Sequence, residues 1–299
     1  MNAVSHAGLL IHGLDVTRRS YYSDCYVAIG RHSMGELHSI HRLYLELVAR
    51  DWNKYLGFIL GMGGLGLVST RGRFLEHYYA FMRYADDIAD RDASVPGGGH
   101  PVEHLERKLR FVRELPAPRD EMERVYLRAV ELATQLGFQI HEESDALLSS
   151  LLFDARRYGS RNFYPAAELE RYYFDRDIFG TGRAMLKALG EDAGKFELLR
   201  PLCTATRLHY DICDFPVDVS KGLVNIARED ADRLGVGVDD LHADNPKVKR
   251  VFGEHARLGL SLLEQHEQNK HAFNVLCRAV FPGFYVLPCR RSLRRYRAL

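Results

Sequence analysis

The sequence predicts an all-α protein whose helices surround a central cavity. Apolar residues recur at three- and four-residue spacing through most of the 299 residues, which is the period of an amphipathic helix. The sequence contains no series of alternating strands and no internal repeat. Two clusters of aspartates lie inside such apolar stretches. Because charged side chains that face inward need a partner or a metal ion, the clusters predict a polar site enclosed by helices.

The expected helices follow one another from Ser33 onward. Ser33 to Glu36 has the pattern of a capping box. The helical spacing after it runs through Leu37, Ile40, Tyr44, Leu47, Val48, Tyr55 and Ile59. A second helix, from Phe74 to Ile88, enters the first aspartate cluster and must end before the loop Val95–Gly99. Further amphipathic stretches cover residues 101–114, 119–138, 143–158, 166–188, 194–215 and 246–280.

The organisation of the chain indicates one domain. No linker rich in proline or serine divides it, so we expect a single domain over residues 1–299, with an N-terminal extension at 1–35 and a basic tail at 283–299. The N-terminus has no early basic cluster, and a secretory signal is therefore not expected. The five cysteines include no C-x-x-C pair, which argues against a zinc site. These features predict a cytoplasmic protein.

The net charge and the distribution of charge limit the kinds of binding partner that we expect. The net charge is +1 and no nucleic-acid-binding motif occurs, so we expect no nucleic-acid partner. The longest uncharged run, residues 55–70, is too short and too rich in glycine for a membrane span. Apolar Phe281–Pro288 leads into the arginine-rich Cys289–Arg297, a segment suited to peripheral contact with an anionic membrane. The alternative is a solvated terminal helix.

The first aspartate cluster places Arg83, Asp86, Asp87 and Asp90 on roughly one face of a helix. Asp86 and Asp90 form a D-x-x-x-D pair, and apolar neighbours narrow the polar face. A solvated surface helix with its aspartates paired to Arg83 is the alternative interpretation. The apolar surroundings favour a functional site.

The second cluster contains Asp211, Asp214 and Asp218, followed by Lys221. Pro216 falls between the last two aspartates and disfavours a regular helix there, so their geometry is less secure than that of Asp86 and Asp90. If the two clusters face each other, four carboxylates line one cavity. That is a hard-oxygen site for Mg²⁺, which binds through one or two carboxylates and substrate phosphates. Lys221 is then a candidate phosphate ligand, or alternatively a solvated turn lysine.

A glycine-rich segment offers a competing interpretation. Gly61–Gly66 fits the G-x-G-x-x-G pattern of dinucleotide-binding folds. That pattern requires a preceding strand and further β-α units, and the sequence shows neither. We therefore expect a glycine-rich break in a helix rather than a nucleotide site.

The two clusters resemble the motifs of a known family. Tyr79–Asp90 resembles the first aspartate motif of the squalene/phytoene synthase family, and Asp214–Val236 resembles the second. The second stretch is similar to the run D-V-x-x-D-x-x-K-G-R-V-Y-L-P-x-E-D of the hydroxysqualene synthase branch. Weaker similarity covers Asp154–Leu186, and the resemblance spans about residues 50–236.

This resemblance implies an isoprenoid synthase fold and a set of roles. Mg²⁺ would be held by Asp86, Asp90, Asp214 and Asp218, and diphosphate by Arg83 and Lys221. Tyr172 or Tyr173 would lie beside the reacting carbons, with the register uncertain by one residue. The expected substrate-binding set also includes Asp87, Asp211, Tyr55 and Arg50. Family members use farnesyl or geranylgeranyl diphosphate and join two chains head to head.

Several positions depart from the family pattern. Arg50-Asp51 replaces an early His-Ser pair, and Tyr210 replaces an asparagine. The arginine and tyrosine after Lys-Gly are Leu223 and Asn225 here. These changes support ionisation of the substrate better than condensation of two chains. Two alternatives follow: a terpene synthase acting on a single prenyl diphosphate, and a catalytically silent member with a binding or assembly role.

Overall fold

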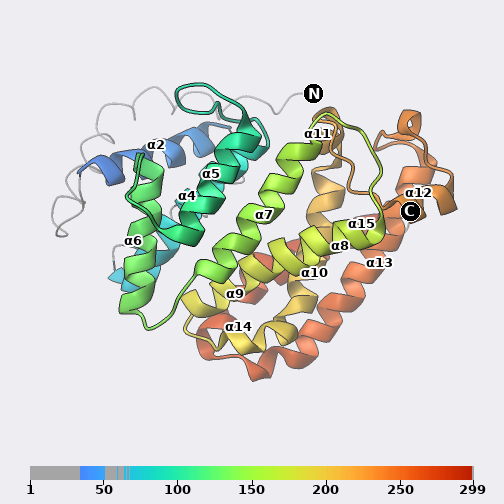
Figure 1. Ribbon diagram of the computed structural model, residues 1–299. Coiled ribbons are helices and arrows are strands. Elements are labelled where there is room, and N and C mark those ends of the chain that lie inside the picture. The colour runs from blue at the N-terminus through green and yellow to red at the C-terminus, as the bar shows by residue number, and fades with distance from the viewer. Residues whose placement is uncertain (1–33, 51–58, 60–63, 65, 67, 298–299) are drawn as a thin grey trace, which may run out of the picture.

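The first half of the protein is a group of helices that ends with α7 (Figure 1). The computed structural model describes residues 34–50, 59, 64, 66 and 68–297. The helices in this half are α2 (Met34–Arg50), α4 (Thr70–Ala89), α5 (Pro101–Glu114), α6 (Glu121–Gln135) and α7 (His141–Arg157). α4 packs against α6 and α7, and α5 also packs against α7.

The second half begins with a helical segment that changes its winding. α8 (Ala166–Tyr172) passes into a π-helical segment, η1 (Tyr173–Ile178), and then into α9 (Phe179–Ala188). The remaining helices are α10 (Phe196–Cys213), α11 (Phe215–Ser220), α12 (Arg228–Leu234), α13 (Pro246–Asn269), α14 (Val275–Phe281) and α15 (Leu287–Tyr296). Short 3₁₀ turns occur at Ala193–Lys195, Val238–Asp240 and Lys270–Ala272, and a second π-helical segment, η5, at Pro282–Val286.

The predicted all-α class is confirmed. Across the described ranges the only β-type pairing is an isolated bridge between Tyr164 and Ala227. The predicted stretch 101–114 coincides with α5, whereas the stretch 246–280 is divided between α13 and α14. The division occurs because Phe273 is extended and the Asn274 side chain accepts a hydrogen bond from Cys277 N–H, which starts a new helix.

Capping side chains also begin α4 and α13. Ser69 Oγ accepts from Gly72 N–H at 3.0 Å and begins α4, the helix that carries the first aspartate cluster. Asn245 caps α13 in the same way, with Pro246 at the helix start, where a missing N–H costs nothing. The capping prediction at Ser33 lies outside the described residues, as do most residues of the glycine-rich segment 61–66.

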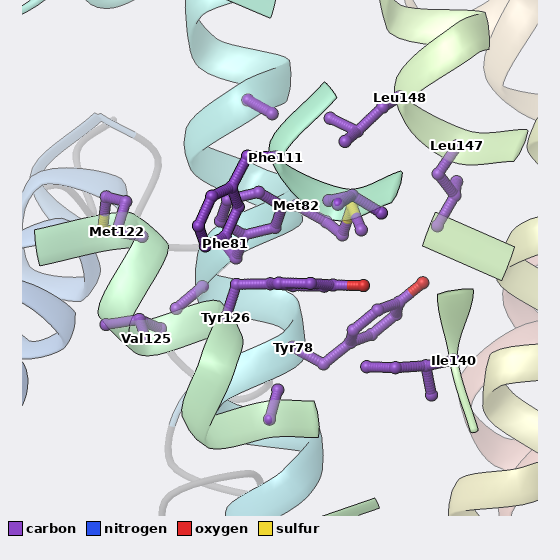
Figure 2. Packing of buried hydrophobic residues seen from close by; sticks show 14 of the residues in the cluster. Tyr78, Phe81, Met82, Phe111, Met122, Val125, Tyr126, Ile140, Leu147 and Leu148 are labelled. Atoms are coloured by element: carbon purple, nitrogen blue, oxygen red, sulfur yellow. The ribbon is translucent and has the colours of Figure 1, made fainter. Parts of the chain in front are cut away.

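The first core lies between α4, α5, α6 and α7. Phe81 and Tyr126 lie with their ring centroids 4.7 Å apart, and both side chains are fully buried. Figure 2 shows their rings beside Phe111 and Met82, with the hydroxyl ends of Tyr78 and Tyr126 directed toward α7. This packing fixes α4, because each of these large side chains loses its exposed apolar surface on folding.

The second core lies between α10, α13 and the last helices. Leu202, Ala205, Phe252 and Ala256 are buried there, and α10 packs along α13. α9 contributes to both cores, since Ala184 and Ala188 belong to the first while Leu186 belongs to the second. The C-terminal ends of α4 and α10 are therefore held by separate cores that share one helix.

Candidate functional site

The first aspartate cluster occupies the last turn of α4. Arg83 Nη1 lies 2.7 Å from Asp86 Oδ2. Arg83 also pairs with the next residue, Asp87, which lies about one helical turn after Arg83. Asp90 ends the helix and donates its N–H to the carbonyl of Asp86 at 2.9 Å. Asp86 and Asp90 thus keep the i, i+4 spacing. Asp87 is buried, with a side chain 2% exposed, and is held by Arg83.

The second cluster spans a break between two helices. α10 ends at Cys213, and α11 begins at Phe215 with Pro216 in its first turn. Proline is tolerated there because the first N–H groups of a helix have no intrahelical partner. Asp218 N–H still donates to the carbonyl of Asp214 at 2.9 Å. Pro216 therefore moves the helix boundary but leaves Asp214 and Asp218 one turn apart.

Lys221 joins the two clusters. Its Nζ lies 3.2 Å from Asp90 Oδ2 and 3.0 Å from Asp92 Oδ1. Gly222, at φ +74°, lets the chain turn directly after it, and a Cβ at this position would lie 2.5 Å from Gly159 Cα. The backbone of Lys221 also accepts a hydrogen bond from Gly159 N–H at 2.8 Å. The turn that carries Lys221 is thus fixed against the segment after α7.

Burial, with a smaller contribution from neighbouring carboxylates, raises the pKa values of two of the aspartates. Burial is the main cause that raises the pKa of Asp218 to about 7; Arg207 opposes it, and Asp211, Asp214 and Asp90 add to it. Burial likewise raises the pKa of Asp86 to about 7, against the effect of Arg83. Because the negative charge of Asp90 helps to raise the pKa of Asp218, the two clusters share one electrostatic environment. Such a group of acids favours any cation that enters it.

Tyr173, rather than Tyr172, belongs to this environment. Its hydroxyl donates to Asp154 Oδ1 at 2.8 Å, and its side chain is buried. Tyr172 instead stacks on Phe153, with the two ring centroids 4.1 Å apart. The π-helical segment begins at Tyr173, and single π turns often occur at functional sites. The structure therefore separates the two tyrosines that the sequence left equivalent.

Arg207 is a site residue that the sequence interpretation missed. Its guanidinium carbon lies 3.7 Å from the centre of the Tyr173 ring. Its nitrogens lie 2.9 Å from Asp211 and 3.4 Å from Asp177. Burial raises the pKa of Asp177, and Arg207 counteracts this. The Arg207–Asp211 spacing of four residues was visible in the sequence, but the approach of Asp177 from η1 was not.

Asn225 and Arg157 complete the polar network. Asn225 Nδ2 donates to Asp211 at 3.2 Å and to Asp218 at 3.0 Å, and so bridges two aspartates of the second cluster. Arg157, at the end of α7, donates to the Val224 carbonyl at 2.9 Å and also contacts Asn225 and Tyr173. Asn225, which stands where the family pattern has a tyrosine, is therefore part of the hydrogen-bond network of the site.

Two predicted substrate-binding residues cannot be placed. Tyr55 lies outside the described residues. Arg50 ends α2, and its side chain also lies outside what the structure describes. All the other predicted site residues lie in the two clusters, at Lys221 or at the two tyrosines.

The acidic set fits a hard divalent cation in its chemistry. Aspartate oxygens are the donors that Mg²⁺ prefers. Within the described ranges, no three His, Cys, Asp or Glu side chains stand close enough together to form a metal-binding group as they lie. Arg83, Lys221 and Arg207 instead pair with the carboxylates. A metal ion would therefore replace these ion pairs rather than enter a preformed cage.

Comparison with known proteins defines the class. An all-α fold with two aspartate segments facing one polar site is that of the isoprenoid synthases. The squalene/phytoene synthase family matches residues 75–298, so the chain belongs to this family, whose enzymes carry out prenyl transfer. No curated protein sequence matches.

Two solved structures share the fold. The crystal structure of squalene synthase HpnC from Alicyclobacillus acidocaldarius has a TM-score of 0.65 and 18% identity, covering 89% of this chain and 96% of that one. A dehydrosqualene synthase in complex with a ligand has a TM-score of 0.61 and 19% identity, covering 88% and 86%. The predicted family and fold are thus confirmed.

Proposed function

We propose that this protein is a Mg²⁺-dependent enzyme that ionises farnesyl or geranylgeranyl diphosphate and joins two prenyl chains head to head. The contact of Lys221 with Asp90 carries the proposal, since it brings the second motif to the first at 3.2 Å. Two acidic segments far apart in sequence then serve one substrate. Family membership supports prenyl transfer, and the chain length of the substrate is part of the proposal.

In this proposal Asp86 and Asp90 would hold divalent ions from one side, and Asp214 and Asp218 from the other. When bound, Mg²⁺ supplies positive charge that stabilises the leaving diphosphate. Arg83 and Lys221 donate hydrogen bonds to the diphosphate oxygens after releasing the carboxylates that they now pair with. Their positive charges are fixed before the bond to carbon breaks, which is the basis of electrostatic catalysis.

Tyr173 and its neighbours would order the space beside the reacting carbons. The Tyr173 hydroxyl donates a hydrogen bond of 2.8 Å to Asp154 Oδ1, which fixes the rotation of that hydroxyl. Arg207 covers one face of the ring. The positive guanidinium would repel a carbocation on that side and attract the negative diphosphate. The diphosphate would therefore lie nearer to Arg207, and the prenyl chain further away.

A single-chain terpene synthase is the second candidate. Leu223, buried with 4% exposure, stands where family members have an arginine after Lys-Gly. The loss of that cation removes a group that would bind a second diphosphate. This observation favours ionisation of one prenyl diphosphate followed by cyclisation or hydrolysis.

The deciding experiment is incubation of the purified protein with Mg²⁺ and farnesyl or geranylgeranyl diphosphate. Released diphosphate and the mass of the hydrocarbon product are measured. A product with twice the carbon count supports condensation, and a single-chain product supports the second candidate. If no prenyl diphosphate is turned over, the protein is a silent family member with a binding or assembly role, and both enzymatic proposals fail.

We further propose that the domain is undivided and the protein cytoplasmic. The supply of side chains from α9 to both cores supports one domain. Among the helices in the described part of the chain, none combines the length and apolar character of a membrane span.

A further inference from the structure

The last helices form one continuous rod with one side anchored in the second core. α14, η5 and α15 follow each other without a break from Val275 to Tyr296. Cys289 and Leu293 are buried, and Gly259 of α13 makes room for Leu293, since a Cβ there would lie 2.8 Å from Leu293 Cδ1. The arginine-rich segment is therefore a fixed part of the fold and presents a defined outer face.

That outer face carries exposed apolar side chains. Phe284 is 59% exposed and Leu287 is 60% exposed. With Arg291 and Arg295 they recur every three or four residues and so form one stripe along the rod. Beside it lies a hollow of about 640 Å³ lined by His209, Gly283, Leu287, Pro288, Arg291, Ser292 and Arg295. We call this stripe and hollow the arginine face.

The charge of the arginine face has one sign. Residues 275–297 contain six arginines and no aspartate or glutamate. Within the described part of the protein, Arg278, Arg290, Arg291, Arg294 and Arg295 form no ion pair. Exposed arginines elsewhere do pair, as Arg113 does with Asp145 and Arg156 with Glu106. A positive surface thus surrounds exposed apolar side chains.

We propose that the arginine face docks the protein on the surface of a bilayer that contains anionic phospholipids. Phe284 and Leu287 enter the boundary between headgroups and acyl chains, while Arg291 and Arg295 bind lipid phosphates. A helix with apolar side chains and a basic polar side lies in the interface plane and gains from both contributions. Guanidinium groups bind phosphate through paired N–H donors, which suits lipid headgroups.

The position of the arginine face places the membrane beside the second aspartate cluster. Cys213 Sγ, directly before Asp214, lies 3.4 Å from Ser292 Oγ of α15. Under the proposed function, a membrane at this face would lie next to the site that receives an apolar prenyl chain. The docking proposal itself depends only on the surface and is tested without turnover.

The test is flotation of the full-length protein with vesicles of phosphatidylcholine alone or mixed with phosphatidylglycerol. We expect binding to the anionic vesicles, weakened about 30-fold in Arg291→Gln/Arg295→Gln, because each basic residue near such a surface contributes roughly a fivefold gain. Phe284→Ser/Leu287→Ser should also release the protein. The matched control is Arg110→Gln/Arg124→Gln, which removes two exposed arginines from α5 and α6 and should leave binding unchanged.

Circular dichroism of each variant distinguishes lost binding from lost folding. Absence of binding to anionic vesicles overturns the proposal, and so does equal binding of the Arg291/Arg295 variant and the control. If the Phe284/Leu287 variant keeps full binding to the anionic vesicles, docking depends on the arginines alone, and the proposed entry of Phe284 and Leu287 into the bilayer is wrong.

Discussion

The two aspartate clusters reach the same site by different means. The first is built mainly within one helix, since Arg83 pairs with Asp86 and Asp87 at spacings of three and four residues, and Lys221 reaches only its last aspartate, Asp90. The second depends on partners from elsewhere, because Asn225 bridges its aspartates and Lys221 reaches across to Asp90. A local motif keeps its geometry through helix periodicity alone, whereas a dispersed motif needs the surrounding fold to hold it. Substitution of Asp86 should therefore affect mainly activity, whereas loss of the partners that hold the second cluster should affect activity together with stability.

The largest effect is expected from Asp86→Ala. This change removes a carboxylate that would hold a metal ion, and we expect turnover to fall by roughly 100-fold or more. Stability should change little, because among the described residues the one ion pair of Asp86 is with Arg83 on its own helix. Diphosphate release measured at several Mg²⁺ concentrations checks both points. Asp239→Ala, at an exposed acid outside the site, is the control; an unaffected rate in Asp86→Ala would count against the proposed site.

Arg207→Gln should produce the largest loss of stability. The change leaves Asp177 without its cation and removes one of the partners of Asp211. Breaking a buried ion pair costs about 3–5 kcal/mol, and the partial exposure of Asp177 places the expected loss at roughly 3 kcal/mol. Urea denaturation measures it.

A double variant separates charge from packing at this position. Arg207→Gln/Asp177→Asn removes both charges and should recover part of the stability lost in the single variant, since an unpaired, partly buried carboxylate no longer remains. Equal stability of the two variants would mean that Arg207 acts through its packing on Tyr173 rather than through its charge.

The contrast between the clusters also explains what the sequence could reveal. Helix periodicity identified α5 and α10, and spacing alone placed Asp86, Asp90 and Arg83 together. The break at Pro216 was visible, but its consequence was not, because that depends on where α11 begins. Asp177 and Arg207 could not be paired from the sequence, since they lie on separate helices and only tertiary packing brings them within 3.4 Å. Tyr172 and Tyr173 were indistinguishable for the same reason.

A smaller effect is expected from Gly222→Ala, which tests how the second cluster is held. Both the positive φ and the contact with Gly159 oppose a side chain there. We expect a loss of about 2 kcal/mol and a higher KM for diphosphate substrate, because the turn that carries Lys221 must shift. Gly235→Ala is the matched control: its φ is +65° but a Cβ would meet no atom within 4 Å, so only the backbone strain of about 1 kcal/mol remains. Similar losses in both variants would show that the contact with Gly159 does not position Lys221.

The smallest effect is expected from the tyrosine pair. Tyr173→Phe removes a hydroxyl that donates to Asp154 and should cost about 1 kcal/mol of stability, with a lower kcat. Tyr172→Phe removes a hydroxyl from a half-buried ring whose main contact is its stack on Phe153, so both quantities should stay near wild type. Thermal unfolding and steady-state kinetics of the two variants measure the difference. A larger loss of kcat in Tyr172→Phe would reverse the assignment, and would mean that the polar network around Arg207 lies beside the reacting carbons without acting on them.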